Sequence, residues 1–285
     1  MAEPARGLLE VVATPIGNLG DLSPRAAQAL RDADVVLCED TRHSAPLLAA
    51  AGSSARTLSL HAHNEEGRIP QVLALLVEGK RVALVSDAGT PCLSDPGARL
   101  VDAAHDAGLP VRTLPGPFAV AAGLAASGLC PLPFAFWGFL PKKSAARQAM
   151  LRERLAPSPG GGAMSHAFYA PGRDLREVLG DVAAVAPAAR VVVARELSKL
   201  HETYHRGRAD VLASSYPEDA LRGEAVVLVE VAEGLAEVGA FDLDGALREA
   251  AASADRKEAL RALARQTGRS RRELYARMLT LIGES

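Results

Sequence analysis

The chain has 285 residues, a formal net charge of −2, 48% hydrophobic residues and 4% aromatic residues. This length allows two compact lobes and a short appendage, and the hydrophobic content excludes a disordered chain. Three cysteines that are far apart and form no CxxC pair argue against a disulfide framework. Because no apolar run is long enough to cross a bilayer and no signal peptide opens the chain, we expect a soluble, cytoplasmic protein with no membrane partner.

Apolar runs typical of strands alternate with helical patterns through the first half of the chain. The expected strands are at 8–13, 35–38, 57–60, 81–85 and 111–114. The expected helices are near 24–33, 44–51, 68–78, 97–107 and 117–126. This alternation predicts an α/β lobe with a mostly parallel sheet, and a further strand at 134–137 leads to a crossing into a second lobe.

In the second half of the chain, β-type runs follow one another with fewer helical patterns between them. A helix over 144–155 and a turn-rich loop at 157–162 precede β-type runs at 167–170, 190–195, 202–206 and 224–231. The scarcity of helical patterns between these runs predicts an α+β lobe with a mixed sheet. We therefore expect an N-terminal lobe at 1–138, a C-terminal lobe at 139–236 and a helical appendage at 237–285.

The appendage contains three helical patterns, at 243–252, 257–265 and 271–282. In the last of them, Leu274, Met278 and Leu281 fall on one face, and Ser270 opens the helix with a capping-box pattern. This spacing predicts a small helix-turn-helix-like unit.

The appendage also concentrates positive charge. Between 255 and 277, eight basic residues outnumber three acidic ones, whereas the whole chain carries −2. A basic element on an acidic body indicates an anionic partner, and a solvated basic face without a ligand is the alternative. The cations left for phosphate or solvent are Arg271, Arg272 and Arg277.

A loop of small and polar residues occupies 86–97, between an expected strand and an expected helix. Ligands bind at the carboxyl ends of strands in open α/β sheets, and this loop exceeds the roughly two to six residues of an ordinary capped connection. Asp95-Pro96 has the pattern of a helix N-cap followed by proline. The turn at 14–17 also follows a strand, and its spacing and lack of lysine argue against a P-loop. The candidate ligand-binding residues are Pro15, Gly17, Asp87, Ala88, Gly89, Thr90 and Ser94.

A charged cluster follows the second expected strand and therefore reaches the same edge of the sheet. Its members are Glu39, Asp40, Arg42 and His43. Two carboxylates, a guanidinium and an imidazole at a ligand edge can bind phosphate and orient or deprotonate a hydroxyl. The alternative is an ion-pair cluster that caps the helix expected from residue 44.

The segment 61–65 (HAHNE) follows the third expected strand. His-x-His spacing can bind a metal, but the two rings of an extended segment point to opposite faces and no further ligand pattern is present, so we expect no metal site. Hydrogen bonding to a substrate by His61 and Asn64 is the preferred interpretation, with a solvated loop as the alternative.

Seven ordered blocks extend over nearly the whole chain. They are 12–22 (VATPIGNLGDL), 38–43 (CEDTRH), 61–65 (HAHNE), 86–97 (SDAGTPCLSDPG), 114–117 (LPGP), 137–141 (WGFLP) and 195–202 (RELSKLHE). Together they resemble the signature of the tetrapyrrole-methylase-like S-adenosylmethionine (SAM) methyltransferases, and in particular their branch of small-subunit rRNA cytidine 2′-O-methyltransferases.

The resemblance implies a bilobal fold with SAM in the cleft between the lobes. It further implies methylation of the ribose of a cytidine in the decoding region of 16S rRNA in the small ribosomal subunit, and a homodimer. On the same grounds Lys199 is expected on the substrate side and Phe168 at the cofactor. Three departures from the family pattern are Phe118 in place of serine, the segment 167–173 (AFYAPGR), and Ser198 in place of threonine.

Two other functions remain open at this level. One is C-methylation of a small anionic tetrapyrrole of the precorrin type, and the other is a non-catalytic RNA-binding assembly factor. The basic appendage favours RNA over a macrocycle, because a small-molecule enzyme has no evident need of it. The loops with Asp and Gly at the strand edge favour an active enzyme.

Overall fold

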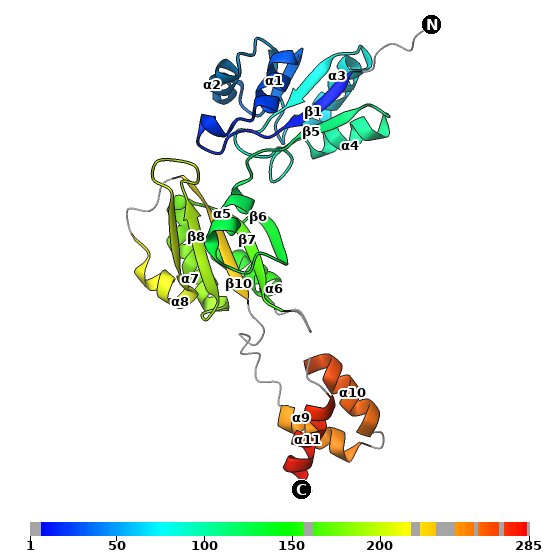
Figure 1. Ribbon diagram of the computed structural model, residues 1–285, viewed down its shortest axis with the longest axis vertical. Coiled ribbons are helices and arrows are strands. Elements are labelled where there is room, and N and C mark those ends of the chain that lie inside the picture. The colour runs from blue at the N-terminus through cyan, green and yellow to red at the C-terminus, as the bar shows by residue number, and fades with distance from the viewer. Residues whose placement is uncertain are drawn as a thin grey trace.

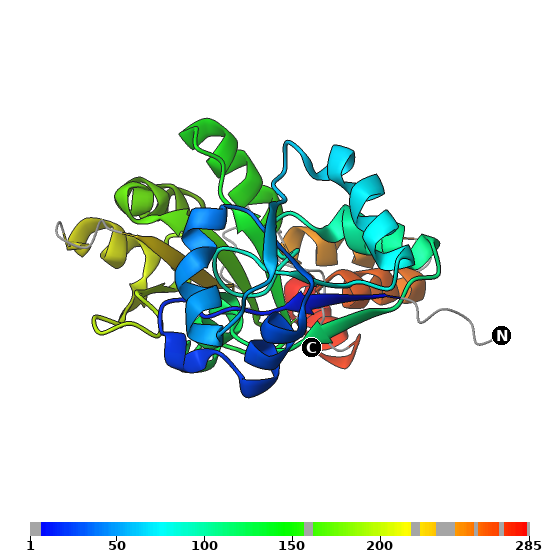
Figure 2. The same cartoon turned by 90° about the horizontal axis from the view of Figure 1, so that it is seen from above.

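The computed structural model describes residues 7–156, 162–217, 223–231, 243–253, 256–267 and 271–283. Two lobes are each built on a five-stranded sheet, and three helices follow at the C-terminal end (Figure 1). In the view from above, the blue and cyan elements of the first lobe lie in front of the green and yellow elements of the second (Figure 2). The expected bilobal α/β architecture with a helical appendage is confirmed.

The first sheet has the order β3-β2-β4-β1-β5, and all its neighbouring strands are parallel. Its strands are β1 (Leu8–Val12), β2 (Val35–Cys38), β3 (Arg56–Ser59), β4 (Arg81–Leu84) and β5 (Val111–Leu114). These bounds agree with the sequence expectation to within one or two residues. Because the strands are parallel, their carboxyl ends meet at one edge of the sheet.

Helices cover both faces of this sheet. One face packs against α1 and α2 through small and aliphatic side chains, and the other packs against α3 and α4. The helices are α1 (Pro24–Asp32), α2 (Thr41–Ala51), α3 (Glu65–Val77) and α4 (Ala98–Asp106). The continuous apolar run of β2 and the apolar residues of β4 are therefore explained, since both sides of these central strands are buried.

The second sheet has the order β6-β7-β10-β8-β9. The pair β6 and β7 is parallel and the other pairs are antiparallel, so the expected mixed sheet is confirmed. The strands are β6 (Phe134–Phe139), β7 (Met164–Pro171), β8 (Arg190–Arg195), β9 (Thr203–Arg208) and β10 (Glu224–Val231). One face is covered by α6 (Ser144–Arg154), α7 (Leu175–Val185) and α8 (Ala209–Ser215).

The other face of the second sheet is covered by α5 (Ala119–Ser127). Val120 and Leu124 of this helix pack in one apolar cluster with Val226 of β10. The expected lobe boundary at 138/139 therefore needs correction, because it falls inside β6. Both α5 and β6 belong to the second lobe, and the chain crosses between the lobes after β5.

The appendage consists of α9 (Leu243–Ala252), α10 (Arg256–Thr267) and α11 (Arg271–Ile282). Leu274 and Met278 are buried in a small core with Leu247 and Leu260, and Leu281 packs against it, as the helical spacing predicts. The expected boundary at 236/237, the capping residue Ser270 and most of the loop at 157–162 lie outside the described residues. None of the described helices combines the length and the apolarity that a membrane span requires.

Candidate functional site

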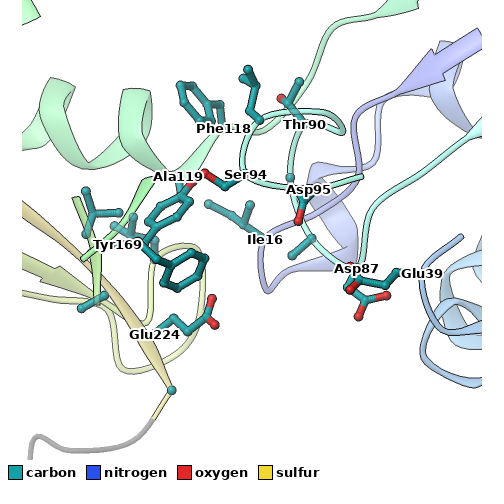
Figure 3. Close-up of a pocket in the computed structure, with 18 of the residues that line it drawn as sticks. Ile16, Glu39, Asp87, Thr90, Ser94, Asp95, Phe118, Ala119, Tyr169 and Glu224 are labelled. Carbon is teal, nitrogen blue, oxygen red and sulfur yellow. The ribbon is translucent and has the colours of Figure 1, made fainter. Parts of the chain in front are cut away.

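A cleft of about 850 Å³ lies between the two lobes. Its first wall is made by residues that follow the five strands of the first sheet, and its second wall by residues of β6, β7, β8 and β10 and of the loop after β8. Figure 3 shows side chains from both walls, among them Ile16 and Asp87 on one side and Tyr169 and Glu224 on the other. This size is within the range of about 300–1,000 Å³ that is typical of small-molecule sites.

The loop after β4 is tied to its two neighbouring loops. Thr14 and Gly89 form a pair of backbone hydrogen bonds, with N to O distances of 2.8 and 3.1 Å. The Thr90 hydroxyl donates to the Pro117 carbonyl at 3.0 Å. Both segments were expected at the ligand edge of the sheet. In the structure the 14–17 turn and the 86–97 loop are hydrogen-bonded to each other beside one cleft.

Two glycines are required at this junction. Gly89 has a φ of +79°, and a Cβ there would lie 3.3 Å from Ile16 Cγ2, directly beside the cleft. At Gly17 a Cβ would lie 2.5 Å from Lys199 Cγ, because the lysine stem crosses the backbone at that point. Gly17 thus makes room for a cleft residue of the second lobe, and it is Ile16, between Pro15 and Gly17, whose side chain lines the cleft.

The far end of the same loop differs from the sequence expectation. The Asp95-Pro96 pair does not cap the next helix, since α4 begins at Ala98 with Gly97 at its N-cap position. Its capping acceptor is Glu65, whose Oε1 receives the backbone N–H groups of Gly97, Arg99 and Leu100 at 3.0, 3.1 and 3.3 Å. A carboxylate from α3 therefore performs the capping that local sequence assigns to Asp95.

The loop between these anchors holds an unusual backbone conformation. Cys92 and Ser94 have φ values of 70° and 71°, in the left-handed region that non-glycine residues rarely adopt. Thr90, Ser94 and Asp95 all line the cleft. The loop therefore adopts a strained backbone at Cys92 and Ser94, and three of its side chains face the cleft.

Acidic side chains dominate the lining of the cleft. The lining carboxylates are Glu39, Glu65, Asp87, Asp95, Glu196 and Glu224, and the lining cation is Lys199. Lys199 Nζ is already paired with Glu196 Oε1 at 3.1 Å. Within the described part of the chain no three His, Cys, Asp or Glu side chains are grouped as metal ligands. A cationic or hydroxyl-rich ligand is therefore favoured here over a polyanion.

The environment of Asp95 changes the pKa of its carboxyl group. Burial raises the pKa of Asp95 from 3.8 to about 6, and the nearby charge of Glu39 adds to the rise. Burial likewise raises the pKa of Tyr169 on the opposite wall to about 12, with a contribution from the Asp95 charge. The cleft therefore holds a carboxylate with a raised proton affinity.

Of the charged cluster at 39–43, Glu39 reaches the cleft and the rest forms the start of α2. Asp40 is the N-cap, with Oδ1 accepting the N–H of Arg42 at 2.8 Å, and its carboxylate pairs with the Arg42 guanidinium at 3.2 Å. The hydrogen bond from the Arg42 side chain, followed by the one from its backbone N–H, lowers the pKa of Asp40. The Arg42 side chain is 91% exposed, and His43 is exposed as well. This arrangement is the ion-pair cap that the sequence left as an alternative.

The segment 61–65 closes a turn before α3. Asn64 Oδ1 accepts the N–H of His61 at 2.9 Å, and Asn64 Nδ2 donates to the Ser59 carbonyl at 3.3 Å. The rings of His61 and His63 meet edge to face with centroids 6.1 Å apart. The residues of this segment that line the cleft are Ala62 and Glu65, so the structure does not bring His61 and Asn64 into the site.

Strand β7 contributes to the cleft through Tyr169 instead of Phe168. Phe168 is fully buried in the core beneath α6 and α7. Successive residues of a strand face opposite sides of its sheet, so the neighbouring Tyr169 faces the cleft. The expectation that the Phe168 side chain lines the cofactor site is corrected accordingly.

A short loop after β8 joins the lobes at the rim of the cleft. Glu196 and Ser198 have φ values of 50° and 66°, and the Ser198 hydroxyl donates to the Asp21 carboxylate of the first lobe. Lys199, expected on the substrate side, lines the cleft from this loop. The hydroxyl kept at position 198 therefore has a structural partner.

The predicted phosphate contacts of the appendage lie on α11. Arg271 is exposed, whereas Arg277 pairs with Asp244 of α9 at 2.8 Å. The side chain of Arg272 is outside the described residues. Arg277 thus joins two helices of the appendage in addition to any role at its surface.

Comparison with known proteins agrees with this architecture. The family profile described as tetrapyrrole (corrin/porphyrin) methylases matches residues 9–213. A protein of Xylella fastidiosa named ribosomal RNA small subunit methyltransferase I is 44% identical over 243 residues, which cover 84% of each chain. One of the same name from Mesorhizobium japonicum is 42% identical over 98% of this chain and 94% of its own length.

Solved structures share the fold at lower sequence identity. A uroporphyrin-III C-methyltransferase of Thermus thermophilus, complexed with S-adenosyl homocysteine, has a TM-score of 0.54 at 19% identity and covers 78% of this chain and 96% of its own. The profile matches most of the chain, and the rRNA methyltransferase relatives share 42–44% of the aligned residues. The chain belongs to the tetrapyrrole (corrin/porphyrin) methylase family, on the branch of the ribosomal RNA small subunit methyltransferases I.

Proposed function

We propose that this protein is a SAM-dependent methyltransferase that methylates the ribose 2′-hydroxyl of a cytidine in the decoding region of 16S rRNA. The substrate is the small ribosomal subunit in the cytoplasm, and the enzyme acts as a homodimer. The observation that carries the proposal is the acid-rich cleft at the carboxyl ends of parallel strands, in a chain whose relatives bear the name of rRNA methyltransferases.

The lining of the cleft fits SAM. Gly89 lines the cleft without a side chain, so a ligand can approach the backbone there, and the apolar side chains of Ile16, Phe118 and Leu197 suit a planar base. When bound, SAM supplies a methyl group on a sulfonium whose positive charge disappears in the transition state. Carboxylates therefore assist most at the α-ammonium group and the sugar hydroxyls of SAM, away from the sulfur.

The same lining distinguishes RNA from a tetrapyrrole. A macrocycle that carries many carboxylates would meet the acids of the cleft as it entered, and like charges repel. An RNA strand is also a polyanion, but a single nucleoside turned out of the strand presents hydroxyls and a neutral base. Its phosphates stay outside, where the basic residues of the appendage can bind them.

The test is methyl transfer onto small ribosomal subunits from a strain that lacks the gene. Incubation with radiolabelled SAM is expected to label 16S rRNA at one cytidine, and alkaline hydrolysis is expected to leave the following phosphodiester intact, since a blocked 2′-hydroxyl cannot attack it. Label on a base or on another ribose would contradict the proposed site. Binding of SAM without any transfer to RNA would favour the assembly-factor alternative.

The appendage is expected to supply a salt-sensitive part of subunit binding. Removing residues 241–285, or changing Arg271, Arg272 and Arg277 together to alanine, should weaken particle binding and methylation while SAM binding survives. Each lost phosphate contact should reduce the slope of log affinity against log salt by roughly 0.9. Methylation measured across a salt series checks this, with the single change Arg271→Ala compared with Arg25→Ala, an exposed arginine of α1. Identical rates and slopes for the truncated and full-length proteins would remove RNA binding from the appendage.

A further inference from the structure

Asp95 has a position in the cleft that no local sequence pattern assigns to it. It lines the cleft from the loop after β4, opposite Tyr169 of β7 (Figure 3). The capping role that its Asp-Pro pattern indicates is filled by Glu65 from α3. Asp95 is thus left with a carboxyl group that points into the site and is not used to hold the helix.

The charged groups around Asp95 come from several elements and are acidic or neutral. Glu39 follows β2, Asp87 lies in the same loop and Glu224 begins β10, and all three carboxylates disfavour its ionised form. A side-chain hydrogen bond with Ser86 works in the opposite direction and lowers the pKa. No cation is among the groups that shift its pKa in the part of the chain that the structure describes.

A thiol interacts with this carboxylate, and a cation lies on the second wall of the cleft. Cys92 of the same loop has its pKa raised to about 11, chiefly by burial and also by Glu65 and Asp95, so it stays a neutral thiol at neutral pH. Lys199 on the second wall is paired with Glu196. Among the described residues, Asp95 therefore has no cationic partner that would lower its pKa.

The loop that carries Asp95 is fixed at both ends. Thr90 is bonded to the loop after β5, and Gly97 is bonded to Glu65. A Cβ on Gly97 would lie 2.5 Å from Leu84 Cδ2, so the backbone is pressed against the core of the first lobe. A group that removes a proton must be held in position relative to its substrate. The hydrogen bonds and packing at both ends of the loop restrict the position of Asp95 in this way.

We propose that Asp95 is the residue that accepts the proton of the ribose hydroxyl during methyl transfer. This inference rests on the proposed function. The bond from the 2′-oxygen to the methyl carbon forms as the bond from sulfur to that carbon breaks, and the sulfur keeps the electron pair of the broken bond. The proton of the hydroxyl passes to a carboxylate oxygen of Asp95 and afterwards to water.

The chemistry of the site favours Asp95 over Asp40 of the charged cluster. Proton transfer is most effective when the pKa of the base lies near the working pH, and burial raises that of Asp95 to about 6. Asp40 is held by Arg42, which lowers its pKa and occupies its oxygens. Below pH 6 Asp95 is mostly protonated and cannot accept a proton, so the methylation rate should rise with pH through this region.

The test compares Asp95→Asn with Asp95→Glu in the full-length protein. Asn keeps the shape but accepts no proton, and a lost general base lowers a rate by roughly 10² to 10⁴-fold. We expect such a loss of single-turnover methylation of small subunits, disappearance of the inflection near pH 6, and partial recovery in Asp95→Glu. Calorimetric binding of S-adenosylhomocysteine should be unchanged, and Asp102→Asn, an exposed aspartate of α4, is the matched control.

A second measurement is independent of activity. The ¹³C resonance of the Asp95 carboxyl carbon, identified by its absence from the Asp95→Asn protein, should titrate near pH 6 in the cofactor-free enzyme. Titration near pH 4, or full activity of Asp95→Asn with an unchanged pH profile, would overturn the inference. The inference would also be overturned if Asp40→Asn lost methylation activity while Asp95→Asn kept it. If the wild-type protein places no methyl group on a ribose hydroxyl, the proposed function itself fails, which is a separate outcome.

Discussion

Leucine in place of Gly89 is expected to abolish binding of S-adenosylhomocysteine while both lobes stay folded. The φ of +79° at this position costs an L-residue about 1–2 kcal/mol. The larger effect is steric, because the Cβ already touches Ile16 Cγ2 at 3.3 Å and the rest of the side chain extends into the cleft. Titration calorimetry measures the loss, and far-ultraviolet circular dichroism checks the fold.

Two variants make this result specific. Gly89→Ala adds only the Cβ and is expected to weaken binding without abolishing it. Gly180→Leu places the same side chain on an exposed face of α7, where a Cβ meets nothing within 4 Å, and should leave binding as it is. Undiminished binding by Gly89→Leu would show that the ligand lies elsewhere in the molecule.

Arg147→Met is expected to give the largest loss of stability among single substitutions in the second lobe. Arg147 is only 2% exposed, its Nε donates to Asp181 at 2.6 Å, and its Nη1 donates to the carbonyls of Pro141 and Lys142, both at 3.2 Å. Methionine fills much of the volume but removes the cation that pairs with Asp181 and the donor to the two carbonyls, so the buried carboxylate keeps only the neutral donors Ser144 and Gln148. Breaking a buried ion pair from one side costs about 3–5 kcal/mol of the free energy of unfolding.

Urea denaturation measures this loss, and two further variants interpret it. Arg152→Met removes an exposed arginine from the same helix and should change the free energy of unfolding by less than about 0.5 kcal/mol. The double variant Arg147→Met with Asp181→Leu removes both charges and should regain much of the stability. A single variant as stable as wild type would mean that the pair contributes no net stabilisation.

The strands and the ligand edge of the first lobe could be predicted because their signals are local. Runs such as 35–38 are apolar at every position, which is typical of strands buried on both faces. The loops at 14–17 and 86–97 directly follow such runs, and parallel strands bring them to one edge. The same applies to Leu274 and Met278, whose spacing on α11 matches their burial.

Other site residues depend on partners that are distant in the sequence. Asp95 resembles an N-cap because the Asp-Pro pattern is a local one, but the cap comes from Glu65, and no local pattern links the two. Asp40 is a different case, because the N–H that it caps belongs to Arg42, two residues away. That partner is local, and the sequence already allowed an ion-pair cap as the alternative.

The second wall of the cleft was the hardest part to predict. Glu196 directly follows β8, and this position at a strand end is a local signal that could identify it. Glu224 is at the beginning of β10, and it reaches the same edge because β10 is antiparallel to β8, with Ala225 opposite Arg195. That pairing is not visible in the sequence, and the choice between Phe168 and Tyr169 likewise depends on which face of β7 is covered by helices.

Each lobe buries its own apolar core, and the cleft has walls from both. A ligand held by both walls therefore binds only when both lobes are folded at the same time. By mass action its binding free energy is added to the stability of the pair, about 2.7 kcal/mol when the ligand is at 100 times its dissociation constant. Two lobes that could otherwise unfold one after the other are then expected to unfold together in one cooperative transition, because the bound cofactor couples their stabilities.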